Sequence, residues 1–182
     1  HLVWLGTSAL ELGAISMFWY AFREREQILD LFELVAGYRM HTRYFQVGGL
    51  AEDIPRGFYP EARKFCEWMP KAIDDYETLL TRNKIWLERT EGLGLLSRDD
   101  AIALGQSGPV LRGSGVDWGL RTAEPYLAYN QSDFHVPVCQ NGAGHSRSLI
   151  HQPAVREPVL VVRHSAHAPP DRRGGGGDAR TP

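Results

Sequence analysis

Apolar residues along the first third of the chain recur at helical spacing. Residues 2–21 are apolar almost all round, interrupted by Glu11, which indicates a helix buried on most sides. After a charged break at residues 23–27, apolar residues return over residues 28–35, and Gly37 is well placed to end this second helix. The pattern therefore predicts two consecutive helices separated by a polar segment.

A strand pattern and a third helix follow. Residues 41–49 alternate between apolar and polar side chains and end in two glycines, which predicts a short strand and a turn. Apolar residues at three- and four-residue steps then predict a helix from Pro60 to Leu80. Pro70 predicts a kink or a break in this helix, because proline has no amide hydrogen and its ring clashes with the preceding turn.

The second half of the chain is poorer in regular patterns. Ser97 and Asp100 form a capping box at the start of a compact helix, which Gly105 ends. Residues 105–126 are mostly loop, and residues 134–138 alternate like an edge strand limited by a proline. The expected fold class is therefore mainly α with a few short β-strands (α+β).

Residues 143–182 differ in composition from the rest of the chain. They contain no Phe, Tyr or Trp, and they are rich in Arg, His and Pro and include the run Gly174 to Gly177. Such a segment buries little apolar surface to offset its conformational entropy, so we expect it to be disordered. Its bias fits both an out-of-frame reading of a GC-rich gene and a natural tail. The expected organisation is one partial domain over residues 1–142 and a low-complexity tail over residues 143–182.

Overall composition narrows the class of protein without indicating a function. The 182 residues are 43% hydrophobic and 23% charged, which is typical of a soluble domain. A membrane-spanning helix is disfavoured by the charge within the first apolar run. The chain opens at His1 inside a helical pattern and without a signal peptide, so it is interpreted as a fragment. A net charge of −2 disfavours nucleic acid as a partner.

The sequence holds few generic chemical motifs. It has no GxSxG, HExxH or P-loop pattern, and its two cysteines, Cys66 and Cys139, have no partner at metal-ligand spacing. We therefore expect no metal bound by this chain alone, and the isolated cysteines favour a reducing, cytoplasmic-side setting.

Two titratable residues remain as candidates for chemistry. Glu11 is a carboxylate within an apolar helix, where burial would require a partner or a proton. His41 lies in the turn between the second helix and the short strand. Each has an ordinary alternative, because a lone histidine is often a hydrogen-bonded packing residue and Glu11 could lie on a locally exposed helix face.

Four long segments resemble, in order and with compatible spacing, successive parts of one protein family. The family is the 49 kDa (D) subunit of respiratory complex I, the proton-pumping NADH-quinone oxidoreductase. The resemblance runs from residue 1 to about residue 142. The segments that carry it are residues 1–33, 38–49, 82–96 and 105–129.

The resemblance implies a fold, partners and a cellular place. The fold would be a fragment of the one shared with the large subunit of nickel-iron hydrogenases, although a hydrogenase itself would need two CxxC pairs that this sequence lacks. The chain would belong to the peripheral arm, associated with the cytoplasmic side of the bacterial cell membrane. It would help form the chamber where quinone, the substrate, is reduced. The terminal [4Fe-4S] cluster would be held by a neighbouring subunit, which is the expected partner together with other peripheral-arm subunits.

The resemblance also implies roles for particular residues. His41 falls on the family's histidine next to the terminal cluster, whose protonation is linked to the redox potential of that cluster. Glu11 falls on an acidic residue, often Asp, that partners a pocket histidine outside this chain and helps deliver protons to the reduced quinone. The loop that holds Arg112, Ser114 and Asp117 would support the quinone pocket or serve in packing.

A rival hypothesis is a catalytically silent, truncated fragment that acts at most as an interaction piece. Under either hypothesis the isolated chain is expected to be inactive as an NADH:quinone oxidoreductase, because the rest of the protein and the cluster-bearing neighbour are needed.

Overall fold

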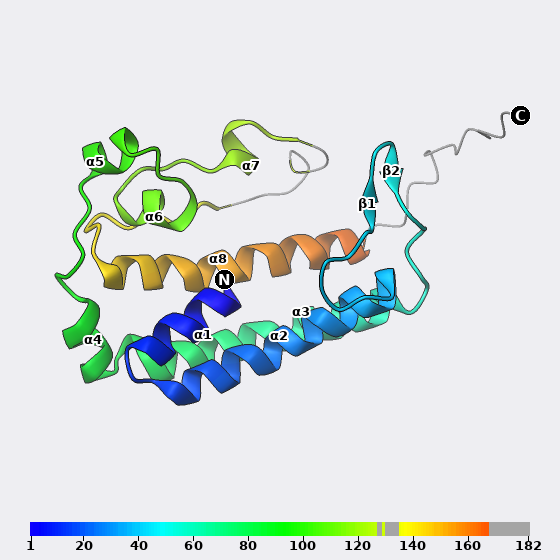
Figure 1. Ribbon diagram of the computed structural model, residues 1–182, viewed down its shortest axis with the longest axis horizontal. Coiled ribbons are helices and arrows are strands. Elements are labelled where there is room, and N and C mark those ends of the chain that lie inside the picture. The colour runs from blue at the N-terminus through cyan, green and yellow to red at the C-terminus, as the bar shows by residue number, and fades with distance from the viewer. Residues whose placement is uncertain (127–128, 130–134, 168–182) are drawn as a thin grey trace, which may run out of the picture.

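The structure is a computed structural model that describes residues 1–126, 129 and 135–167. These residues are mainly helical with one two-stranded sheet, so the predicted mixture of helices and short strands is confirmed (Figure 1). The helices are α1 (Leu2–Glu11), α2 (Ile15–Ala36), α3 (Phe58–Tyr76), α4 (Lys84–Thr90), α5 (Arg98–Ala103), α6 (Gly108–Gly113), α7 (Leu120–Ala123) and α8 (Gly144–His167). A π-helical turn, η1 (Glu77–Thr81), follows α3, and the strands are β1 (Phe45–Gln46) and β2 (Gly49–Leu50).

A glycine turn divides the first apolar run into two packed helices. α1 ends at Glu11, and Gly13 takes a left-handed φ of 93° before α2 begins. α2 continues through residues 23–27, where the sequence predicted a break, because Arg, Glu and Gln are good helix formers. It ends where predicted, since Gly37 is left-handed and its amide donates to the Glu33 carbonyl at 2.8 Å.

The third helix passes through its proline. α3 continues beyond Pro70 to Tyr76, so the break predicted at the proline is absent, and the π-helical turn η1 begins only at Glu77. Met69, Ile73 and Tyr76 are buried along one face of α3. Burial of this face stabilises the helix across the hydrogen bond that Pro70 cannot donate.

The core lies where α1, α2 and α3 meet α8 (Figure 1). Each large apolar side chain buried there contributes about 2 kcal/mol of transfer free energy. The larger members of the core are Leu5, Met17, Cys66, Met69, Ile73, Tyr76, Leu80 and Trp86.

The first apolar run is less buried than its composition predicted. Ile15 and Trp19, one helical turn apart on α2, expose 57% and 67% of their surface. Apolar residues that share one helix face and stay exposed are typical of surfaces that contact another molecule. No helix within the described part of the chain is both long enough and apolar enough to cross a membrane.

Residues 144–167 form α8, where composition predicted part of a disordered tail. α8 packs against α3 and α6 and buries Ile150, Ala154 and Val159. Composition missed this helix because it contains no aromatic residue, and its small and aliphatic side chains are buried through contacts with α3 and α6. Arg156 adds ion pairs to α3 and η1, at 2.5 Å from Asp74 and 3.3 Å from Glu77.

The strand predicted over residues 41–49 is a β-hairpin. β1 and β2 pair antiparallel with Phe45 opposite Leu50. Of the strand predicted over residues 134–138, residue 134 lies outside the described residues, and residues 135–138 have no regular structure. Cys139 therefore follows an irregular segment, where its amide donates to the carbonyl of Arg112 at 3.1 Å.

The N-cap half of the predicted capping box is present at the start of α5. The Ser97 hydroxyl accepts from the Asp100 amide at 3.1 Å and donates to the Asp100 carboxylate at 2.6 Å. Gly105 follows α5 with a left-handed φ of 64°, as expected for the residue that ends a helix. The short helices α6 and α7 lie within the segment predicted as loop.

Candidate functional site

His41 lies on the exposed loop that joins α2 to β1. Its φ of 54° is left-handed, and no other non-glycine residue has a positive φ within residues 1–126, 129 and 135–167. This conformation costs about 1–2 kcal/mol for a residue with a Cβ. Strain of this kind is found preferentially where the position of a side chain matters.

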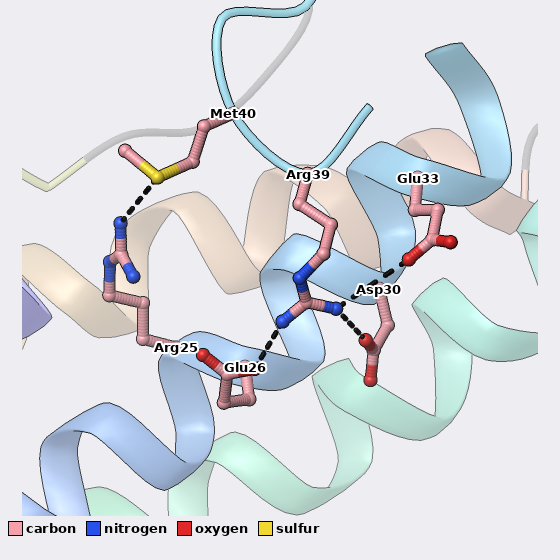
Figure 2. Close-up of polar contacts among 6 residues, drawn as sticks. All are labelled: Arg25, Glu26, Asp30, Glu33, Arg39 and Met40. Carbon is pink, nitrogen blue, oxygen red and sulfur yellow. Dashed lines mark hydrogen bonds and ion pairs between the residues drawn. The ribbon is translucent and has the colours of Figure 1, made fainter. Parts of the chain in front are cut away.

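The residue two positions before His41 ties the loop to α2. The guanidinium of Arg39 is 2.6 Å from Asp30 and 3.6 Å from Glu33, and it also forms an ion pair with Glu26 (Figure 2). These carboxylates raise the pKa of Arg39, first through the hydrogen bond from Arg39 to Asp30. The guanidinium therefore remains charged, and three carboxylates on one side of α2 share it.

A second side chain of the loop also contacts α2. The Arg25 guanidinium lies 3.9 Å from the sulfur of Met40 and can donate to it (Figure 2). Both residues that immediately precede His41 are therefore held against the same helix. The imidazole follows an anchored segment rather than a free loop.

Glu11 is not the buried carboxylate that the sequence predicted. It is the last residue of α1 and is exposed, because α1 ends there and the chain turns at Gly13. A carboxylate at a helix C-terminus faces the negative end of the helix dipole, which is unfavourable by about 0.3–1 kcal/mol. The exposed side chain is accessible to a partner from another part of the full protein.

Glu11 and His41 lie at opposite ends of α2. The 22 residues of α2 span about 33 Å at 1.5 Å per residue. Figure 1 shows the turn between α1 and α2 at one end of the molecule and the β1–β2 hairpin at the other. The two candidates therefore do not form one site within this chain.

The third group of candidates divides between a cavity and the surface. Arg112 lines a cavity of about 440 Å³ together with aromatic residues, among them Trp118 and Tyr126. Burial and the nearby Arg121 lower the pKa of Arg112. Its Nε is buried without an acceptor among the described residues.

The two neighbours of Arg112 are placed differently. Ser114 is buried, and its hydroxyl donates to the Val110 carbonyl at 3.3 Å within α6, which indicates a packing role. Asp117 is exposed and does not line the Arg112 cavity. The structure therefore brings only Arg112 to a cavity.

Among the residues that the structure describes, the buried carboxylate is Glu24, which belongs to the segment that the sequence predicted as a charged break between two helices. Glu24 is fully buried at the α2–α3 contact and accepts from Arg23 at 2.6 Å and from the Trp68 indole at 3.4 Å. Burial, and secondarily the charge of Glu24, raise the pKa of Tyr76. Glu24 of α2 is thus bonded to its neighbour Arg23, whose side chain is half exposed, and to Trp68 of α3. This network is a structural link between α2 and α3.

Metal-binding side chains do not gather in the described residues. No group of three or more His, Cys, Asp or Glu is placed to hold an ion there. Cys66 is buried and Cys139 is half-buried, and neither forms a disulfide bond. Burial raises the pKa of the Cys139 thiol, which disfavours the thiolate that would bind a metal.

Comparison with known proteins gives the family. Residues 11–175 match the family described as respiratory-chain NADH dehydrogenase, 49 Kd subunit, so the match continues past residue 142, where the sequence resemblance was expected to end. The chain is 52% identical over 165 residues to the NADH-quinone oxidoreductase D 2 subunit of Roseiflexus sp. (strain RS-1), covering 91% of this chain and 40% of that protein. It is 48% identical over 165 residues to the NADH-quinone oxidoreductase D subunit of Geotalea uraniireducens, covering 91% of this chain and 42% of that protein.

A third relative agrees with these two. Identity is 46% over 171 residues to the NADH-quinone oxidoreductase D 2 subunit of Koribacter versatilis, covering 94% of this chain and 43% of that protein. The chain thus spans about 40% of the length of the curated relatives that it matches. The chain belongs to the family of the respiratory-chain NADH dehydrogenase 49 Kd subunit.

Proposed function

We propose that this chain helps form the quinone-reduction site of a proton-translocating NADH-quinone oxidoreductase. The supporting observation is its 46–52% identity to the D subunits of such enzymes over about nine-tenths of its length. In this proposal it is part of the peripheral arm on the cytoplasmic side of the bacterial cell membrane, and its fold is a fragment of the hydrogenase large-subunit type. Other subunits of the complex, and quinone as substrate, are its partners.

His41 is the proton-binding residue in this proposal. A [4Fe-4S] cluster held by a neighbouring subunit would supply single electrons, and His41 would face it from this chain. A negative charge added nearby favours the imidazolium form, so reduction raises the pKa of the histidine and a proton is taken up. The exposed position of His41 on an anchored loop supports contact with a neighbouring subunit.

The linkage between electron and proton is reciprocal. If reduction raises the imidazole pKa, protonation must raise the cluster potential by the same free energy. One pKa unit corresponds to about 1.4 kcal/mol, or about 59 mV for a one-electron couple. His41 would therefore make the cluster potential depend on pH between two pKa values of the imidazole, one with the cluster oxidised and one with the cluster reduced. His41→Met would remove that dependence.

Glu11 serves quinone protonation in the same proposal. Its exposed carboxylate at the end of α1 can contact a histidine supplied by another part of the full protein. The length of α2, about 33 Å at 1.5 Å per residue, separates it from His41, which fits two distinct roles. Arg112 supports the quinone pocket as a positively charged cavity residue. Ser114 and Asp117 belong to the same loop, where Ser114 supports it through packing.

The role of Glu11 is tested by Glu11→Gln in the assembled complex. This change keeps the shape of the side chain and removes its proton-exchanging carboxylate, so we expect quinone reduction to fall about 10²-fold or more. Reduction of the iron–sulfur clusters by NADH should change little. Both rates are measured on the same preparation, by quinone turnover and by rapid-freeze spectroscopy of the clusters.

Glu67→Gln is the control for this experiment, because Glu67 is an exposed glutamate on α3 with no part in the proposed sites. It should leave both rates within a factor of about two. Equal losses of cluster reduction and quinone turnover in Glu11→Gln would reject the assignment.

A further inference from the structure

Three carboxylates of α2 form a stripe that a single loop residue covers. Glu26, Asp30 and Glu33 are separated by four and three residues, so they lie on one face of the helix. Figure 2 shows their side chains directed toward the guanidinium of Arg39. Each carboxylate is more than half exposed, with side-chain exposures of 57%, 67% and 58% in that order.

The arrangement depends on the shape of an arginine. An isolated exposed ion pair contributes little, but a planar guanidinium can donate in several directions at once and can bind separate carboxylates. Without it the three carboxylates would repel one another along the helix. A lysine would keep the charge in this position but could not match the same set of donors.

The position of this anchor determines where His41 can be. Arg39 and His41 are two residues apart, so their Cα atoms are separated by at most about 7 Å. The left-handed φ of His41, 54°, sets its direction relative to the anchored segment. Beyond it, Phe45 and Val47 of the hairpin are strongly exposed and so provide little packing on this side.

We propose that Arg39 is a positioning residue for His41: by binding the carboxylate stripe of α2, it fixes the distance between the imidazole and the redox centre that His41 faces. This inference rests on the proposed function of His41. In this inference Arg39 does not touch the redox centre; it acts by holding the loop that carries His41. The charged groups around the anchored loop are Arg25, Glu26, Asp30 and Glu33 from α2, with Arg39 and Arg43 from the loop itself.

The proposal separates two effects that substitution of Arg39 could have. A change of charge alone displaces both histidine pKa values, those with the cluster oxidised and reduced, in the same direction. A longer distance between His41 and the cluster weakens their Coulomb interaction. The interval between the two histidine pKa values, with the cluster oxidised and with it reduced, therefore becomes narrower. The interval is read from the pH range over which the cluster potential changes.

The test is a redox titration of the assembled complex as a function of pH in the wild type, Arg39→Gln and Arg39→Lys. We expect Arg39→Gln to narrow the interval, because release of the loop lets the imidazole move away from the redox centre and the Coulomb energy varies inversely with distance; a doubled distance would narrow the interval to about half. Arg39→Lys should recover part of the interval. An interval of unchanged width in Arg39→Gln, displaced or not, would overturn the proposal.

Three further variants complete the design. Asp30→Asn weakens the anchor from the α2 side and should narrow the interval in the same direction. Combined with Arg39→Gln, Asp30→Asn should narrow the interval no further, because the ion pair between Arg39 and Asp30 is already lost. If Arg39→Gln prevents assembly, the double variant Asp30→Asn with Glu33→Gln takes its place, because it retains Arg39. The same titration is then measured on this double variant. An unchanged interval overturns the proposal.

His41→Met distinguishes failure of this inference from failure of the proposed function. If His41→Met removes the pH dependence but Arg39→Gln leaves the interval unchanged, the role of His41 stands and positioning by Arg39 is rejected. If His41→Met itself leaves the pH dependence intact, the proposed function of His41 fails.

Discussion

Replacing Gly142 by alanine should destabilise the fold by about 3 kcal/mol or more. Gly142 has a left-handed φ of 62°, and a Cβ at this position would overlap the carbonyl oxygen of Leu96. The same residue joins two other segments, since its amide donates to the Gly113 carbonyl at 2.8 Å and its own carbonyl accepts from the Leu96 amide at 3.1 Å. An alanine side chain would therefore be strained by the left-handed backbone and would also overlap the Leu96 backbone.

Gly105→Ala is the matched control for this prediction. Gly105 has nearly the same φ, 64°, but no neighbouring atom of the described residues lies within 4 Å of the position of an added Cβ. Its substitution should cost about 1 kcal/mol, from backbone strain alone. Urea unfolding of the chain measures both changes, and equal losses in the two variants would show that the contact with Leu96 does not exist.

Replacing Glu24 by alanine should also cost about 3 kcal/mol. Glu24 is fully buried, while its partner Arg23 has a half-exposed side chain. Removing one partner of a buried ion pair usually costs about 3–5 kcal/mol, and the low end applies because Arg23 can turn into solvent. The substitution also removes an acceptor from the Trp68 indole and leaves a cavity between α2 and α3.

Glu67→Ala provides the comparison on the opposite helix. Glu67 is exposed on α3, so its substitution should change the free energy of unfolding by less than about 0.5 kcal/mol. Unfolding curves of the two variants at one pH give the difference. If Glu24→Ala were as mild as Glu67→Ala, the buried network would not be a link between these helices.

The elements that the sequence predicted are those whose signals are local. Gly37 ends α2 because only a local left-handed conformation is needed, and the capping box of Ser97 and Asp100 depends on residues three apart. The hairpin at residues 45–50 follows from alternation and two glycines. In each case a short segment contains the whole physical cause.

The features that the sequence missed depend on contacts between distant segments. Glu11 lies within an apolar run and Glu24 within a charged segment, but α1 ends at the first, which is exposed, and α3 covers the second, which is buried. The helix α8 was missed because it is stabilised by packing against α3 and α6. These outcomes are set by tertiary packing, which overrides local composition.

The anchor of the candidate histidine illustrates the same limit. His41 could be selected from the sequence through a family resemblance, but Arg39 gave no separate signal. Its role depends on the stripe of carboxylates, which becomes visible only when the loop folds back onto α2. A helical projection of residues 26–33 would have shown the stripe, but not its partner.

In the proposed function, His41 lies beside a redox centre held by a neighbouring subunit and binds a proton when that centre is reduced. Pulsed electron paramagnetic resonance of the reduced, assembled complex, with ¹⁵N-labelled histidine, tests it most directly. We expect a histidine-nitrogen coupling to the terminal cluster that disappears in His41→Met, together with loss of the pH dependence of its potential. A spectrum identical in the wild type and His41→Met would contradict the account.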